Sequence, residues 1–106
     1  MFQRAGDVPI GVPSNMVQYA ALALMLSHLT GYEAEEFVHT ISDAHIYEDQ
    51  IEKLMPMLER KPRSFPTVKL TAEGNKINDI HNFRAKHFEL ADYDPHPAIV
   101  GIPVAT

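Results

Sequence analysis

The sequence predicts an α+β fold in which one central, buried helix packs on a mixed or antiparallel sheet. Three observations support this prediction. Residues 16–29 place apolar side chains around almost the whole circumference of a helix, a pattern typical of a buried helix. Residues 37–41 and 67–70 are rich in strand-forming side chains. Pro and Gly residues separate these segments, as in a single folded unit.

The first strand and the long helix are expected in the N-terminal third. Residues 1–13 contain Gly and Pro at intervals that suit a short strand and a tight loop. The helix is expected to begin at Asn15, because Gln18 follows three residues later as a capping partner and Pro13 lies just outside. It is expected to stop at Gly31.

A short helical turn is expected at residues 33–36, and a strand at residues 37–41. A second helix is predicted from about Tyr47 to Arg60, because its apolar side chains recur on one face and its charged side chains on the other. Pro56 interrupts this pattern and is expected to kink the helix or force a restart.

The C-terminal third is expected to be largely extended. Residues 67–70 alternate like a strand, and residues 73–76 form a turn. Residues 88–90 are predicted as a last short strand, and residues 93–97 as an extended loop with two proline-fixed positions.

The composition excludes several classes of function. The chain has 106 residues, with 9 Lys and Arg against 14 Asp and Glu, so neither nucleic acid nor an anionic membrane surface is an expected partner. It contains no cysteine, which excludes disulfides, thiolate metal sites and a cysteine nucleophile within this chain and favours a reducing, cytoplasmic location. The longest apolar stretch, residues 19–29, is shorter than the roughly 20 residues that span a bilayer.

A few polar residues could bind a ligand, although each also has a simpler structural explanation. Arg4 could hold a phosphate or remain solvated, and Asn15 could bind a nucleobase or cap the helix. Asp43, His45 and Tyr47 alternate along a predicted strand and would share one face, where they could bind a sugar. Two possible metal ligands without a third are weak support for a metal, so none is expected.

Three sequence motifs in order along the chain change this interpretation. They are QRAGD with GVPSN (residues 3–7 and 11–15), DAHIY (43–47), and YDPHP with PVAT (93–97 and 103–106). Together they resemble the C-terminal part of thymidylate synthase, whose pattern is QRSxDxxLGxPFN heading a long helix, then DxHLY, then YxPHP near an end of the type PVAI. The turn at residues 60–66 is similar to the family's REPRPLP-like turn.

The resemblance implies a thymidylate synthase-like fold and a methyltransferase that converts dUMP to dTMP with 5,10-methylenetetrahydrofolate as the donor of carbon and hydride. It implies that Arg4 binds the nucleotide phosphate and that Asn15 contacts the pyrimidine edge. His45 and Tyr47 would hold the deoxyribose hydroxyl, and Asp7 would hold the folate pterin ring. The implied partners are dUMP and dTMP, together with a second copy in a homodimer or a missing N-terminal segment.

The chain also departs from the family pattern. Ala5 replaces a serine, Ser14 replaces an aromatic residue, and the family's cysteine nucleophile is absent. Deoxycytidylate hydroxymethylases carry aspartate where this chain has Asn15, so the resemblance favours uracil. We therefore expect residues 1–106 to be the C-terminal portion of a thymidylate synthase-like domain, inactive alone and with no catalytic residue of its own. The alternative is a non-catalytic nucleotide-binding or dimerisation module of the same fold.

Overall fold

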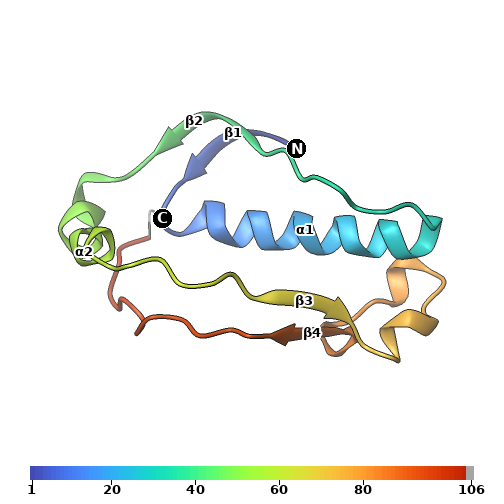
Figure 1. Cartoon of the computed structure of the whole chain (residues 1–106). Helices are drawn as coiled ribbons and strands as arrows, with labels where there is room; N and C mark the ends of the chain where they lie inside the picture. The colour runs from blue at the N-terminus through green and yellow to red at the C-terminus, as the bar shows by residue number, and fades with distance from the viewer. Residues whose placement is uncertain (105–106) are drawn as a thin grey trace. The chain divides into compact units, whose positions relative to one another are not determined.

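The computed structural model of the chain describes residues 1–104 and confirms the α+β class (Figure 1). Its regular elements, in chain order, are β1 (Phe2–Asp7), α1 (Gly11–Thr30), β2 (Thr40–His45), α2 (Glu48–Leu58), β3 (Thr67–Leu70) and β4 (Phe88–Ala91), with three short 3-10 helices between β3 and β4. The chain forms two compact units. The first comprises residues 1–20, 36–62 and 97–104, and the second comprises residues 21–35 and 63–96.

The first unit contains a parallel strand pair rather than part of one larger sheet. β1 pairs with β2 so that Ala5 lies opposite Asp43 and Asp7 lies opposite His45. Beyond the pair, the backbone N–H of Val8 still donates to the carbonyl of His45 at 2.9 Å. The parallel pairing therefore aligns the carboxyl ends of both strands.

Helix α1 differs from the prediction at its start and in its burial. It begins at Gly11, four residues before the predicted Asn15, and no residue along its described length is buried. Pro13 lies within the first turn instead of outside it. A helix tolerates proline there, because the first backbone N–H groups have no intrahelical acceptor and none is lost. The expected central, buried helix is thus half-buried or exposed in this chain.

The predicted second strand is displaced. Residues 31–39 form no regular element, so the helical turn at 33–36 and the first half of the strand at 37–41 were wrong. β2 begins at Thr40, which lies opposite Phe2, because pairing with β1 sets where the strand starts. Ahead of it, the ring of Phe37 stacks on Tyr19 with a centroid separation of 6.4 Å.

Helix α2 confirms the predicted second helix between Glu48 and Leu58. Leu54 on its inner face is buried. The helix runs through Pro56 without the expected restart. The hydrogen bond that Pro56 cannot donate would reach the carbonyl of Glu52, which lies on the exposed side and can be hydrated.

The second unit is built around an antiparallel pair, which confirms both predicted C-terminal strands. β3 pairs with β4 so that Thr67 lies opposite Ala91. The turn expected at residues 73–76 is a 3-10 helix at Gly74–Lys76, and two further 3-10 helices at Ile80–Asn82 and Ala85–His87 were not predicted. Residues 93–97 are extended, as predicted.

Phe83 forms the centre of the second unit and is 8% exposed. Its ring meets His28 edge-on at 6.2 Å and lies 6.0 Å from Phe88. Gly74 belongs to the same packing, since a Cβ there would lie 2.6 Å from the carbonyl oxygen of His87. Among residues 1–104, only Phe83 and Leu54 are buried hydrophobic side chains, one in each unit.

Candidate functional site

The candidate residues all belong to the first unit, where β1 and β2 end side by side. Asp7 closes β1 and His45 closes β2, and the two are paired in register. Helix α1 follows β1 and helix α2 follows β2 after short connections. Residues beyond the carboxyl ends of adjacent parallel strands commonly line ligand sites in α/β proteins, so this edge is the candidate site.

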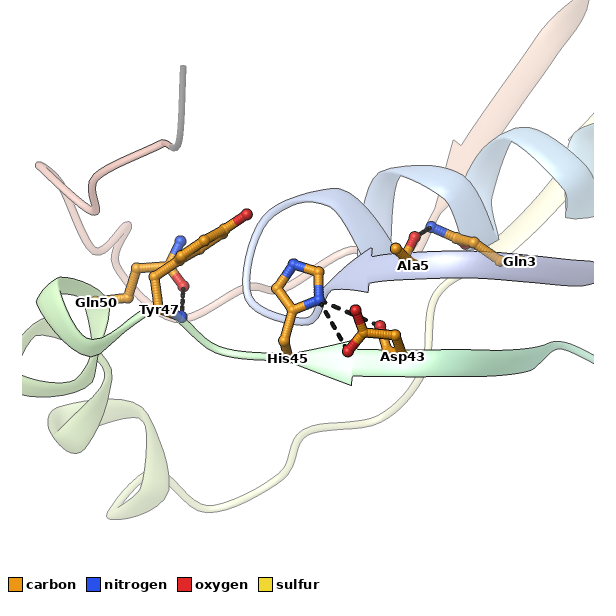
Figure 2. A network of polar contacts seen from close by, with 6 residues as sticks. All are labelled: Gln3, Ala5, Asp43, His45, Tyr47 and Gln50. Atoms are coloured by element: carbon orange, nitrogen blue, oxygen red, sulfur yellow. Dashed lines mark hydrogen bonds and ion pairs between the residues drawn. The ribbon is translucent and has the colours of Figure 1, made fainter.

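His45 and Tyr47 form the first part of the site, as Figure 2 shows. Their rings meet edge-on with centroids 5.1 Å apart. The Nδ1 of His45 lies 3.2 Å from the backbone carbonyl of Asp43 and 3.6 Å from its carboxylate. Because a carbonyl can only accept, Nδ1 carries the proton, and Nε2 of a neutral ring is then an acceptor. Tyr47 is 40% exposed.

Asn15 belongs to a second group of polar side chains, connected through Gln3. Gln3 Nε2 donates to Asn15 Oδ1 at 3.1 Å and to the carbonyl of Ala5 at 2.8 Å. Gln3 Oε1 accepts from His39 Nε2 at 2.9 Å. Asn15 lies inside α1, not at its start, so the predicted capping role is wrong. Its carbonyl oxygen is engaged, and its amide N–H groups are the donors that it can offer to a ligand.

Arg4 is placed on β1 and is exposed. Within residues 1–104, its guanidinium has neither a hydrogen bond nor an ion pair, and nothing in that part of the chain links it to Asp7 or Asn15. The structure therefore brings Asp7 and His45 together but leaves Arg4 as a separate, accessible cation. An unpaired guanidinium can form two parallel hydrogen bonds to a phosphate.

Gln50 is a site residue that the sequence analysis missed. Its side chain is 0% exposed. Gln50 Nε2 donates to the two carboxylate oxygens of Asp7 at 3.3 and 3.2 Å, and Gln50 Oε1 accepts from the backbone N–H of Tyr47 at 3.0 Å. The signal in the sequence was its spacing, because a Gln three residues after a helix cap commonly accepts from the cap N–H.

Metal binding finds no support in residues 1–104, where no group of three or more His, Asp or Glu side chains could hold an ion. Asp43 and His45 are two possible ligands without a third among these residues, and the Asp43 side chain is 70% exposed. In the same part of the chain, no helix is both long and apolar enough to cross a membrane.

The remaining motifs make contacts of their own. Arg63 Nη1 donates to the backbone carbonyls of Asp94 and Pro95 at 3.1 and 3.0 Å. It also forms an ion pair with the Asp94 carboxylate at 2.8 Å. These contacts join the turn motif to the YDPHP motif within the second unit. Of the terminal PVAT motif, Pro103 accepts from Gln50 Nε2 at 3.0 Å. Ala105 and Thr106 lie outside the described residues.

Comparison with known proteins agrees with these motifs. The family model "Thymidylate synthase" matches residues 1–105. The chain is 43% identical over 99 residues to "Thymidylate synthase 1/2" of Encephalitozoon cuniculi and 43% identical over 99 residues to "Thymidylate synthase" of Homo sapiens. Each comparison covers 93% of this chain but only 33% and 31% of the relative, so the chain spans about a third of their length. Because the family model covers nearly every residue, the chain belongs to the thymidylate synthase family.

Proposed function

We propose that this chain supplies nucleotide-binding residues to a thymidylate synthase, the methyltransferase that converts dUMP to dTMP, and that it is inactive alone. The observation that carries the proposal is the pairing of Asp7 with His45 at the aligned strand ends, with Tyr47 packed on His45. These residues fall within two of the motifs shared with the family. The proposal is consistent with the family match and gives each polar group a chemical task.

The nucleotide contacts follow from the available donors and acceptors. His45 Nε2 accepts a hydrogen bond from the deoxyribose hydroxyl, and the Tyr47 hydroxyl forms a second hydrogen bond with the same group. The Asn15 amide donates to the carbonyl oxygen on the uracil edge. Arg4 binds the phosphate dianion with its exposed guanidinium. Ala5 replaces the hydroxyl that the family pattern offers at this point, so the phosphate has one donor fewer.

Asp7 is the proposed contact for the folate. When bound, 5,10-methylenetetrahydrofolate supplies the one-carbon unit and the hydride. The Asp7 carboxylate is half-buried and accepts from one amide N–H of Gln50, so it keeps lone pairs for further donors. Pterin rings carry N–H groups that suit such an acceptor, and the residue present therefore fits this ligand.

Two observations support inactivity of the chain alone. The attack on the pyrimidine requires a thiolate, and the chain has no cysteine. Among residues 1–104 few apolar side chains are buried, while Val17 is 71% and Phe65 94% exposed. We propose that a segment corresponding to the remaining two thirds of the relatives provides the cysteine. The apolar cover comes from that segment or from a second copy within a homodimer.

Complementation tests the proposal. The chain is co-expressed with the N-terminal two thirds of the human relative, purified as a complex, and assayed chromatographically for dTMP formation from dUMP. Activity is expected in the complex and not in either part. The control complex carries serine in place of the cysteines of the human segment. A stable complex without dTMP formation would reject the proposal.

The alternative is a non-catalytic module that binds nucleotide or mediates dimerisation. The missing thiol, Ala5 and Ser14 favour it. Two measurements together separate the non-catalytic module from a part of an active thymidylate synthase. They are calorimetric titration of the chain alone with dUMP and dTMP, and the complementation assay. Nucleotide binding together with failure to complement would support the module.

A further inference from the structure

Gln50 is the most deeply buried large side chain in the described part of the molecule, and its polar atoms reach three separate segments. Its Oε1 accepts from the Tyr47 backbone N–H at 3.0 Å. Its Nε2 donates to Asp7 at 3.2 and 3.3 Å and to the carbonyl of Pro103 at 3.0 Å. All of these segments belong to the first unit.

The amide uses its hydrogen-bonding capacity in two distinct ways. A primary amide has one carbonyl oxygen and two N–H donors. The oxygen caps α2 at Tyr47, a task that needs only an acceptor. One N–H is shared between the two Asp7 oxygens, and the other is directed at Pro103. The donors therefore have no part in capping and instead join Asp7 to the C-terminal segment.

A buried amide without hydrogen-bond partners would destabilise the fold. Burial of Gln50 therefore requires its hydrogen bonds to Tyr47, Asp7 and Pro103. Asp7 is the residue that we have assigned to the folate, and Tyr47 is assigned to the nucleotide. We propose that Gln50 is a positioning residue: its amide fixes the orientation of the Asp7 carboxylate and anchors residues 98–104 against it. This inference rests on the proposed function for Asp7. Because the Gln50 amide fixes the carboxylate, the remaining lone pairs of Asp7 point in a defined direction. This lowers the entropic cost of ordering the Asp7 side chain when a planar donor binds.

The substitution Gln50→Glu separates the two tasks. Glutamate retains an acceptor for the Tyr47 N–H, so the helix cap remains. It loses both donors and places a second carboxylate beside Asp7, which repels it. Gln18→Glu is the matched control, because Gln18 is an exposed glutamine on α1.

The substitution Gln50→His is the rescue variant. A neutral imidazole also offers one acceptor and one donor. The chain already uses histidine in this way, since Nδ1 of His87 accepts from the backbone N–H of Arg84, three residues earlier, at 3.0 Å. Histidine at position 50 can cap Tyr47 with Nδ1 and direct its Nε2 proton to Asp7.

The experiment uses the full 106-residue chain labelled with ¹⁵N. Heteronuclear NOE values report the mobility of residues 98–104, and titrations with dUMP and then folic acid report binding. Gln50→Glu is expected to mobilise residues 98–104 and to weaken folic acid binding about tenfold, the effect of losing one hydrogen bond to a charged group. The dissociation constant of dUMP should stay within about twofold of the wild-type value because the Tyr47 cap is retained. Gln50→His should restore folic acid binding through its one donor to Asp7, whereas residues 98–104 should stay mobile because the Pro103 carbonyl still lacks a donor. Gln18→Glu should change neither readout.

The outcomes separate this inference from the proposed function. A wild-type chain that binds neither dUMP nor folic acid would count against the proposed function, and the NOE values would then decide the anchoring role of Gln50. Unchanged mobility of residues 98–104 in Gln50→Glu overturns that role. Equal loss of dUMP and folic acid binding overturns positioning of Asp7, because it indicates general destabilisation. Failure of Gln50→His to restore folic acid binding also overturns the positioning of Asp7 by Gln50.

Discussion

The side-chain amide of Gln3 donates to the carbonyl oxygen of Asn15 at 3.1 Å, which joins β1 to α1. Because its Oε1 also accepts from His39, Gln3 fixes three segments of the first unit. The contact determines which atoms of Asn15 can meet a ligand. The oxygen is directed to Gln3, which leaves the amide N–H groups as the donors that Asn15 can offer to a ligand.

The substitution Gln3→Glu should destabilise the first unit. It places a carboxylate oxygen opposite the Asn15 carbonyl oxygen, so two acceptors face each other and a partly buried hydrogen bond is lost. We expect the free energy of unfolding to fall by about 1–2 kcal/mol in urea denaturation. The control is again Gln18→Glu at an exposed position. Equal stability of the two variants would show that the Gln3 contacts contribute nothing.

The substitution Asn15→Asp should change the nucleotide preference without affecting the fold. Aspartate still accepts from Gln3 but has no N–H for uracil, and its oxygen can accept from the amino group of cytosine. We expect weaker binding of dUMP and stronger binding of dCMP in calorimetric titrations. Asn82→Asp, at an exposed position of the second unit, is the control and should leave both affinities unchanged. An unaltered preference in Asn15→Asp would remove Asn15 from the base-binding site.

The substitution Arg4→Ala should remove the phosphate-dependent part of nucleotide binding. Arg4 is exposed, and its guanidinium has no hydrogen bond or ion pair within residues 1–104, so the free energy of unfolding should not change. Loss of a charge-assisted hydrogen bond predicts about 10- to 100-fold weaker binding of dUMP. Deoxyuridine, which lacks the phosphate, should bind both proteins equally. Lys53→Ala removes an exposed positive charge from α2 and serves as the control. If it weakens dUMP binding as strongly as Arg4→Ala, net charge rather than Arg4 is responsible.

The isolated chain should self-associate through its exposed apolar side chains. Large uncovered apolar surface favours association, and Val17 on α1 is 71% exposed. Sedimentation velocity at micromolar concentrations is expected to show species larger than a monomer. Val17→Glu should reduce them, whereas Ser14→Glu adds the same charge at an exposed polar position of the same helix and should have a smaller effect. A purely monomeric wild-type chain would show that its apolar surface does not drive association.

The substitution Arg63→Ala should loosen the YDPHP loop. Arg63 holds two backbone carbonyls and the Asp94 carboxylate, whereas Lys86 forms a single exposed ion pair with Glu73. We expect the free energy of unfolding to fall by about 1 kcal/mol for Arg63→Ala and by less for Lys86→Ala. Amide exchange at residues 93–96 should accelerate only in Arg63→Ala. Similar exchange in both variants would assign the effect to charge alone.

The local sequence was sufficient for much of the fold. Side-chain periodicity correctly predicted α2, and alternation correctly predicted β3. The last short strand expected at residues 88–90 is confirmed as β4. The motifs were sufficient for the family, because their order along the chain does not depend on packing. Residue types also indicated the candidate ligand-binding groups, since a guanidinium, an amide and an imidazole each have characteristic partners.

Tertiary contacts determined the features that the sequence alone could not. β2 starts at Thr40 because β1 provides its pairing partner there, and a strand boundary set by a distant segment leaves little local signal. Burial of α1 depends on what covers it, so apolar periodicity predicted a buried helix that this chain alone leaves half-covered. The role of Gln50 as a link depends on the tertiary structure. Its amide forms hydrogen bonds with Asp7, Tyr47 and Pro103, residues that are distant in sequence and meet only in the folded first unit.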